Sequence, residues 1–199
     1  NDYPLFKPYL ERIIAAQKSL MAHMYPGKDT YDALLEEFSE GLSVEMLDPF
    51  FANVKAKLVP VIHAVYQSGN QADDSLLHRP FPIEGQRRLS SFVMDFLGID
   101  RDSCVIGEVE HPFTTEFNKH DVRLTTHYHE DDVLSNMFSV AHEGGHCLYE
   151  LNMGDELIGS PLSGGATMTL HESQSRLFEN MICRSREFIA LLYPKMKEI

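Results

Sequence analysis

The sequence predicts a mainly α-helical protein with a small antiparallel β-sheet beside its longest helical segments. Apolar residues recur at the helical period over most of the first half of the chain, and again after residue 133. Between these regions lie two short stretches, 105–110 and 121–128, that are rich in β-branched and aromatic residues. The first regions favour helices and the two short stretches favour strands.

The first half is expected to be helical because its apolar residues keep helical spacing and its breaks fall at glycine or proline. Ser43 is a favourable N-cap, with Glu45 in the turn that follows it. The polar, proline-flanked run 67–82 is expected to be a loop. The expected helices cover residues 5–21, 31–38, 44–65 and 83–97.

The second half begins with the two expected strands. The alternation over 121–128 is typical of a strand with one buried face, and the glycine and asparagine between the strands favour an antiparallel pair. A helix is expected over residues 133–151 and a glycine-rich loop over 152–165. A last helix is expected over 166–192, ended by Pro194.

The composition excludes several classes of protein. The chain has 199 residues, of which 43% are hydrophobic and 24% charged, as in a globular domain. Its formal net charge of −13 argues against nucleic acid or an anionic membrane as the main partner. No stretch approaches the ~18 consecutive apolar residues of a membrane span. The charge is weaker evidence about a peptide substrate.

The ends and the cysteines give two further expectations. The start of the chain lacks the basic and apolar parts of a secretory signal, so none is expected. The chain also begins without methionine, and we expect both ends to be cut from a longer protein. Its cysteines, Cys104, Cys147 and Cys183, have irregular spacing, which favours a reducing compartment and predicts no disulfide framework.

The segment from Ala141 to Cys147 reads Ala-His-Glu-Gly-Gly-His-Cys and carries the strongest chemical signal. On a helix, His142 and His146 lie one turn apart on one face, so both imidazoles can reach one zinc ion at about 2.0–2.1 Å. Glu143 then lies beside the metal, where it can take a proton from water and pass it to a leaving amine. This is the His-Glu-x-x-His pattern of zinc peptidases.

Two glycines lie inside the same predicted helix. Gly144 and Gly145 each cost about 1 kcal/mol relative to alanine in a helix interior. Such a pair is a poor structural choice unless something approaches the helix closely. We expect the approaching group to be the backbone of a substrate.

A catalytic zinc site needs a third protein ligand and an open position. The candidates are His171 and Glu172, on the next expected helix. Consecutive residues point about 100° apart on a helix, so one of the two is expected to face the metal. The pattern leaves the choice between them open.

Four ordered motifs resemble those of the carboxypeptidase Taq family of zinc metallocarboxypeptidases. The family's motifs are H-P-F, D-x-R-x-T, H-E-x-x-H and H-E-[SG]-Q. The matching residues are His111-Pro112-Phe113-Thr114-Thr115, Asp121-Val122-Arg123-Leu124-Thr125, His142-Glu143-Gly144-Gly145-His146 and His171-Glu172-Ser173-Gln174.

The resemblance implies a function and a set of site residues. It makes His142, His146 and Glu172 the zinc ligands and Glu143 the general base. It also implies a mostly helical fold with a small sheet beside the metal groove, a homodimer, and an intracellular (cytoplasmic) location. The implied substrates are peptides, which lose single C-terminal residues with broad specificity.

One departure from the family concerns the chain's extent. Members carry two further motifs downstream, I-R-x-x-A-D and G-x-x-Q-D-x-H-W, and neither occurs in this sequence. We therefore expect residues 1–199 to be a partial catalytic domain, an N-terminal or middle fragment that contains the zinc site.

Four other residues are candidates for substrate binding or for supporting the ligands. His111 either lies near the groove or fixes a turn before proline. Arg123 could bind a substrate carboxylate, but an ion pair with Asp121 is favoured. Gln174 and Arg176 follow the third ligand on its helix and are candidates to hold it in place. Cys147, beside a ligand, is interpreted as a buried small apolar residue.

Other readings of the zinc motif stay open. An endopeptidase or oligopeptidase would use the same chemistry, and a metal-binding fragment without activity would use the same ligands. Two histidines and a carboxylate suit Zn²⁺, but Co²⁺ or another divalent metal could also bind.

Overall fold

The computed structural model describes residues 2–70 and 72–199. The chain forms two compact units, Asn1–Gln71 and Ala72–Ile199. Among the described residues, no helix combines the length and the apolar character that a membrane crossing requires.

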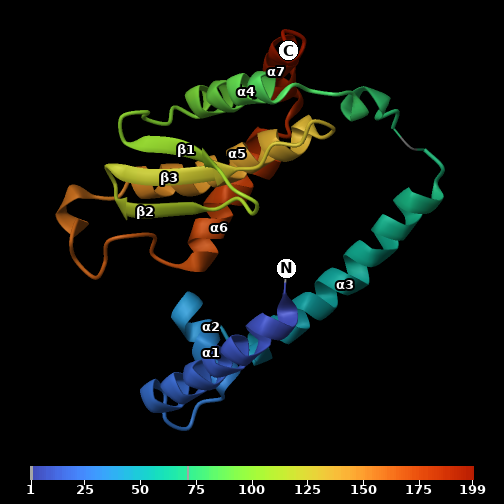
Figure 1. The fold of residues 1–199 in the computed structure, drawn as a ribbon. Helices are drawn as coiled ribbons and strands as arrows, with labels where there is room; N and C mark the ends of the chain where they lie inside the picture. Colours follow the sequence, from blue (N-terminus) through green and yellow to red (C-terminus); the bar gives the residue numbers. More distant parts are fainter. Residues whose placement is uncertain (1, 71) are drawn as a thin grey trace. The chain divides into compact units, whose positions relative to one another are not determined.

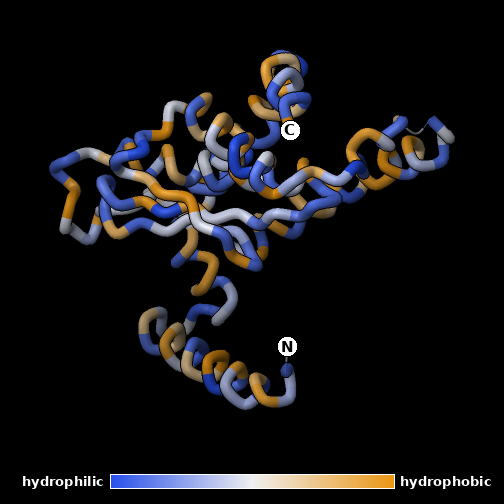
Figure 2. Tube along the Cα trace, turned by 45° about the horizontal axis from the view of Figure 1, so that its top comes forward, coloured by the Kyte–Doolittle hydropathy of each residue, from blue (hydrophilic) through white to orange (hydrophobic). Residues whose placement is uncertain are grey.

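The first unit consists of helices, as its apolar period predicts: α1 (Tyr3–Met24), α2 (Thr30–Phe38) and α3 (Val44–Gln67) (Figure 1). The expected cap at Ser43 is confirmed, since its hydroxyl accepts the N–H of Met46 at 3.3 Å. Apolar and polar residues alternate along these helices (Figure 2), and many of the apolar side chains on α1 and α3 are exposed.

The second unit holds a sheet and the helices around it (Figure 1). Within residues 72–199 the helical elements are η1 (Ser75–His78), α4 (Ile83–Phe96), α5 (Val133–Leu151), η2 (Asp155–Leu157), α6 (Met168–Arg176), η3 (Leu177–Ile182) and α7 (Arg186–Met196). Here η1 and η2 are short 3₁₀ helices and η3 is a π-helical segment.

The sheet has three strands in the order β1-β3-β2: β1 (Cys104–Glu108), β3 (Asp121–Thr126) and β2 (Thr114–Asn118). The mainly α fold class with a small sheet is confirmed. However, the two strands expected from the sequence, β1 and β3, run parallel, and β2 forms the antiparallel pair with β3. The sheet is therefore mixed, because β2 lies between the two expected strands in sequence and reverses the chain before β3.

Helix α5 is the centre of the second unit: it packs against β2 and β3 on one side and against α4, α6 and η3 on others. Its buried face includes Val133, Met137, Val140 and Ala141, which join a core with residues of α4 and β3. This packing fixes the helix that carries both candidate metal-binding histidines.

The prediction of one continuous helix over residues 166–192 is wrong, because the segment is divided into three elements. Helix α6 ends at Arg176, the π-helical η3 follows, and α7 begins after Ser185. Ser185 accepts the N–H of Phe188 at 3.1 Å, so it starts a new helix instead of continuing the old one. Pro194 lies inside α7, which ends at Met196.

Candidate metal centre

Helix α5 presents the two histidines of the motif. Asp132 caps the helix by accepting the N–H of Ser135 at 2.9 Å. His142 and His146 then lie one turn apart on the face opposite the core, with side chains 19% and 15% exposed.

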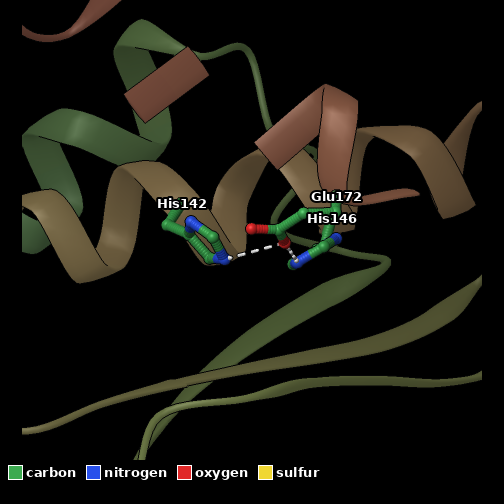
Figure 3. A group of neighbouring side chains, drawn as sticks. All are labelled: His142, His146 and Glu172. Atoms are coloured by element: carbon green, nitrogen blue, oxygen red, sulfur yellow. Dashed lines mark ion pairs between the residues drawn. The ribbon is translucent and has the colours of Figure 1, made fainter. Parts of the chain in front are cut away.

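The third group comes from α6 (Figure 3). One oxygen of Glu172, Oε2, lies 3.5 Å from Nε2 of His142 and 3.5 Å from Nε2 of His146. These three residues form a group of potential ligand atoms that lie within 4.8 Å of one another. Donors bound tetrahedrally to zinc at about 2.0–2.1 Å lie about 3.3 Å apart, so the spacing fits one metal ion.

The carboxylate of Glu172 is held by its own helix. Ser175 Oγ lies 2.9 Å from Oε2, and Arg176 Nε donates to Oε1 at 2.7 Å. Partial burial acts to raise the pKa of Glu172, but the hydrogen bonds from Arg176 and Ser175 outweigh it and lower the pKa. The group is therefore an anion at neutral pH, as a metal ligand must be.

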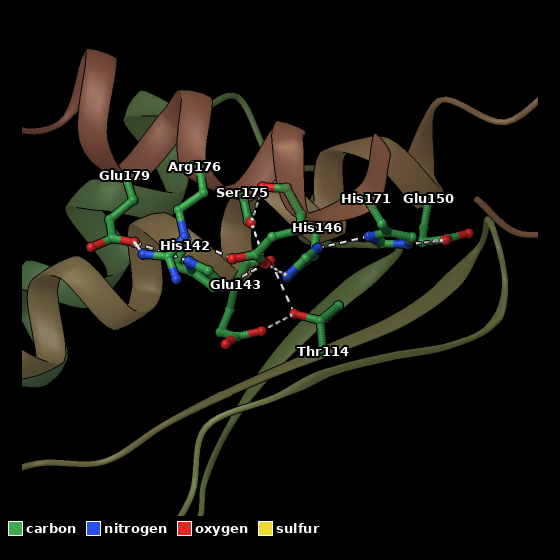
Figure 4. Close-up of polar contacts among 10 residues, drawn as sticks. Thr114, His142, Glu143, His146, Glu150, His171, Ser175, Arg176 and Glu179 are labelled. Carbon is green, nitrogen blue, oxygen red and sulfur yellow. Dashed lines mark hydrogen bonds and ion pairs between the residues drawn. The ribbon is translucent and has the colours of Figure 1, made fainter. Parts of the chain in front are cut away.

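Glu143 lies next to the histidines but faces the sheet (Figure 4). The Thr114 hydroxyl, at the start of β2, donates to its Oε2 at 2.7 Å. Burial raises the pKa of Glu143, while the bond from Thr114 and the nearby His142 pull it the other way. A carboxylate with a raised pKa is suited to take a proton and release it again.

Behind His142 lies a buried carboxylate, Glu179. It accepts from Nδ1 of His142 at 3.0 Å and is held by Arg184 at 2.7 Å and by Arg176 at 3.2 Å. Glu179 lies in the π-helical segment η3, and such segments are frequent at functional sites. Its bond to Nδ1 leaves Nε2 of His142 free for a metal.

Behind His146 lies a second histidine. Nδ1 of His146 is 2.7 Å from Nδ1 of His171, and Nε2 of His171 is 2.5 Å from Oε1 of Glu150 (Figure 4). Burial, followed by the neighbouring histidines, lowers the pKa of His146 from 6.5 to about 4. The neutral imidazole that metal binding needs is thus the stable form at neutral pH.

The structure gives a different reason for the two glycines than the one expected. A Cβ at Gly145 would lie 2.7 Å from Cα of Ser175 and 2.9 Å from the carbonyl oxygen of Gln174, on the backbone of α6. A Cβ at Gly144 would lie 2.6 Å from the tip of Leu97. The close approach is therefore that of other parts of the protein: Gly145 allows the backbone of α6 to reach α5, and Gly144 makes room for Leu97.

Two adjoining hollows, of about 630 and 550 Å³, flank the motif. His111, His142 and Glu143 line both of them, so the structure brings His111 to the site. The second hollow is also lined by Thr114 and by the loop that contains Gly165.

The other three predicted residues differ in their placement. Nε of Arg176 donates a hydrogen bond to Glu172. Arg123 forms the favoured ion pair with Asp121, through two hydrogen bonds of 2.9 Å, and lies over the ring of Phe117. Gln174 contributes its backbone carbonyl to the α5 contact, and its side chain has no hydrogen bond to the site within residues 2–70 and 72–199.

Several site residues were missed from the sequence. Thr114 lies inside a recognised motif, but β2 was not expected, so nothing indicated that it faces Glu143. Ser175, Glu179 and Arg184 follow Glu172 along the chain, and Glu179 lies in η3, whose π-helical geometry no pattern predicts. Glu150 could have been found, because it lies four residues after His146 on the same helix face.

Comparisons with known proteins agree along the whole chain. The family model described as Carboxypeptidase Taq (M32) metallopeptidase matches residues 1–199. Carboxypeptidase 1 of Bacillus subtilis (strain 168) is 41% identical over 198 residues, which is 100% of this chain and 40% of that protein.

Two solved structures have the same fold. The crystal structure of BsuCP matches with a TM-score of 0.94 and 41% identity, over 99% of this chain and 40% of that one. The M32 carboxypeptidase from Deinococcus radiodurans R1 matches with a TM-score of 0.88 and 34% identity, over 99% and 39%. This chain therefore spans 40% of the length of the Bacillus subtilis relative.

Proposed function

We propose, since this chain belongs to the carboxypeptidase Taq (M32) metallopeptidase family, that it carries the metal centre and general base of a zinc-dependent metallocarboxypeptidase. The proposed reaction removes single residues from the C-termini of peptides with broad specificity. The observation that carries the proposal is the convergence of His142, His146 and Glu172 beside Glu143. The relatives named above are carboxypeptidases, which supports the same reaction class.

Zinc is the proposed metal because two imidazoles and one carboxylate are the donor set of many catalytic zinc sites. Co²⁺ or another divalent ion with similar preferences could replace it. When bound, the metal supplies Lewis acidity, polarising the scissile carbonyl and lowering the pKa of water towards about 7.

The residues of this chain perform the proton transfers in the proposed mechanism. Glu143 takes a proton from the attacking water and then delivers it to the leaving amine. The raised pKa of Glu143 brings it closer to the neutral range in which both transfers are easy. The Thr114 hydroxyl holds the carboxylate in place through its 2.7 Å bond.

The extent of the protein is also part of the proposal. Since the chain spans 40% of the Bacillus subtilis relative, we take residues 1–199 as a partial catalytic domain of a longer enzyme. The match of the family model to both compact units supports one catalytic domain. Peptide substrates, a homodimer and a cytoplasmic location are proposed from the family resemblance.

The test is Glu143→Gln in the complete protein, with metal content and peptide products measured by mass spectrometry. The proposal expects about one metal ion per chain in both proteins, with turnover lowered about 10²–10⁴-fold in the variant. A ladder of single-residue losses identifies a carboxypeptidase, whereas internal fragments would identify an endopeptidase. Equal turnover, or no metal in the parent, would overturn the proposed function.

A further inference from the structure

His171 was a candidate metal ligand, and the structure places it on the other side of His146. Glu172 lies 3.5 Å from Nε2 of His146, and His171 lies 2.7 Å from Nδ1 of the same ring. Two consecutive residues of α6 thus contact the two nitrogens of one imidazole, Glu172 as drawn in Figure 3 and His171 as drawn in Figure 4. Both candidates therefore contact His146. Glu172 lies beside Nε2, the nitrogen that faces the proposed metal position, and His171 lies beside Nδ1.

The end groups fix the direction of every hydrogen bond in this chain of contacts. Nε2 of His146 must keep its lone pair for a metal, so its proton lies on Nδ1. Nδ1 of His171 then accepts that proton, which puts the proton of His171 on Nε2. Glu150 is a carboxylate and accepts from Nε2, at 2.5 Å. One assignment of protons satisfies all three groups.

The burial of Glu150 indicates that this arrangement is more than a surface ion pair. Its side chain is 4% exposed, and that of His171 is 15% exposed. A buried carboxylate is costly unless it is fully hydrogen-bonded. Oε1 of Glu150 accepts from His171 and also from the N–H of Gly165, at 3.0 Å.

The ring of His171 is also held in place from its sides. Tyr149 meets it edge-on, with ring centroids 5.0 Å apart and an interplanar angle of 86°. A Cβ at Gly165 would lie 2.4 Å from Cδ2 of His171, so that position must stay free of a side chain. With these contacts the ring has little freedom to turn, and it can transmit its orientation to His146.

The two metal-binding histidines therefore have different supports. His142 contacts Glu179 directly, whereas His146 reaches its carboxylate through a second imidazole. We infer that His171 and Glu150 are positioning residues, which fix the tautomer and orientation of His146 and thereby the affinity of the site for zinc. This inference rests on the proposed metal site.

The experiment measures zinc affinity by competition with a chromophoric chelator, in the complete protein that contains this sequence. His171→Phe removes the acceptor and keeps a ring, and we expect it to weaken zinc binding about 10–100-fold. Glu150→Ala should weaken it similarly, while Glu150→Gln keeps an acceptor for Nε2–H and should retain most of the affinity. The visible absorption of the Co²⁺ form should shift in His171→Phe and in Glu150→Ala, because the ligand field reports how His146 is held.

Tyr149→Phe is the matched control. Its ring stays against His171, but the variant loses the bond between the Tyr149 hydroxyl and the N–H of Ala166, at 3.3 Å, which anchors the same loop. The inference expects parental zinc affinity in this variant. A loss as large as that of Glu150→Ala would mean that the effect runs through the loop, and would overturn the inference.

Other results separate this inference from the proposed function. The positioning role would be overturned, and the metal site left intact, if the parent binds zinc and His171→Phe has a zinc affinity within about twofold of it and an unshifted Co²⁺ spectrum. A parent that binds no zinc would overturn the site itself. If His171→Phe does not fold, Glu150→Ala against Glu150→Gln decides, and equal affinities of these two would contradict the inference.

Discussion

The contact between α5 and α6 leads to a sharp prediction at Gly145. In Gly145→Ala, the added Cβ would lie 2.7 Å from Cα of Ser175, and relaxing this to about 3.5 Å requires a shift of about 0.8 Å. The obstacle is backbone, so α6 must move as a body. This movement carries Glu172 away from the two histidines. In the parent protein, Oε2 of Glu172 lies 3.5 Å from Nε2 of each histidine.

We expect Gly145→Ala to lower kcat/KM more strongly than it lowers the free energy of unfolding. Overpacking costs about 1–3 kcal/mol, and the better helix propensity of alanine returns about 1 kcal/mol, so the free energy of unfolding should fall by about 0–2 kcal/mol. A misplacement of about 1 Å can lower the rate about 100-fold. We therefore expect a loss of kcat/KM on that scale, together with weaker zinc binding.

Gly144→Ala is the matched control, because it gains the same propensity in the same helix. Its Cβ would meet the side-chain ends of Leu97 and Ile99, at 2.6 and 3.3 Å, and these can rotate away. The assays are thermal unfolding, zinc competition and peptide hydrolysis. Parental zinc affinity and kcat/KM in Gly145→Ala, or a larger loss in Gly144→Ala, would refute the reasoning. A rise in KM without a change in zinc affinity would restore the idea that the glycines admit substrate.

Three further predictions concern the groups around the candidate metal centre. Thr114→Val removes the hydrogen-bond donor to Glu143, so the pKa of Glu143 should rise. The acidic limb of the pH profile of kcat/KM should therefore move to higher pH, and kcat/KM at neutral pH should fall about tenfold. An unchanged pH profile would contradict this. Glu179→Gln weakens the partner of His142, and zinc competition should show a loss of about 10–100-fold. The metal-free protein should lose stability as the pH falls from 6.5 to about 4. In this range His146 is protonated in the unfolded chain, whereas in the folded chain its pKa of about 4 keeps it neutral. The loss, up to about 3 kcal/mol in urea titrations, should be absent in His146→Gln.

The helices were predictable because their signals are local. The apolar period over residues 133–151 and the cap at Ser43 each depend on a few neighbouring residues, and both agree with the structure. Strand β2 was missed because its residues, Thr114–Asn118, are exposed or half-buried and show no alternation of buried and exposed positions. Without β2, the direction of the β1–β3 pair could not be inferred, since alternation within a strand is the same in parallel and antiparallel pairs.

The candidate site was predictable to the extent that its residues share one helix. His142, Glu143 and His146 follow from helical spacing, and the resemblance supplied Glu172. The supporting residues were harder, because Glu179 reaches His142 from a π-helical segment and Thr114 reaches Glu143 from a strand. Such contacts depend on how elements pack, and spacing within one element carries no information about that.

In the second unit, the contact between α5 and α6 affects both the packing of the protein and the geometry of the candidate metal centre. The absence of a side chain at Gly145 lets α6 come close to α5, and the same approach brings Glu172 to both candidate metal-binding histidines. The supports of those histidines also lie on either side of this interface, with Glu150 on α5 and Glu179 beyond α6. A change that separates the two helices should therefore weaken metal binding before it unfolds the protein, because Glu172 depends on the α5–α6 distance while the core also draws on α4, β3 and α7.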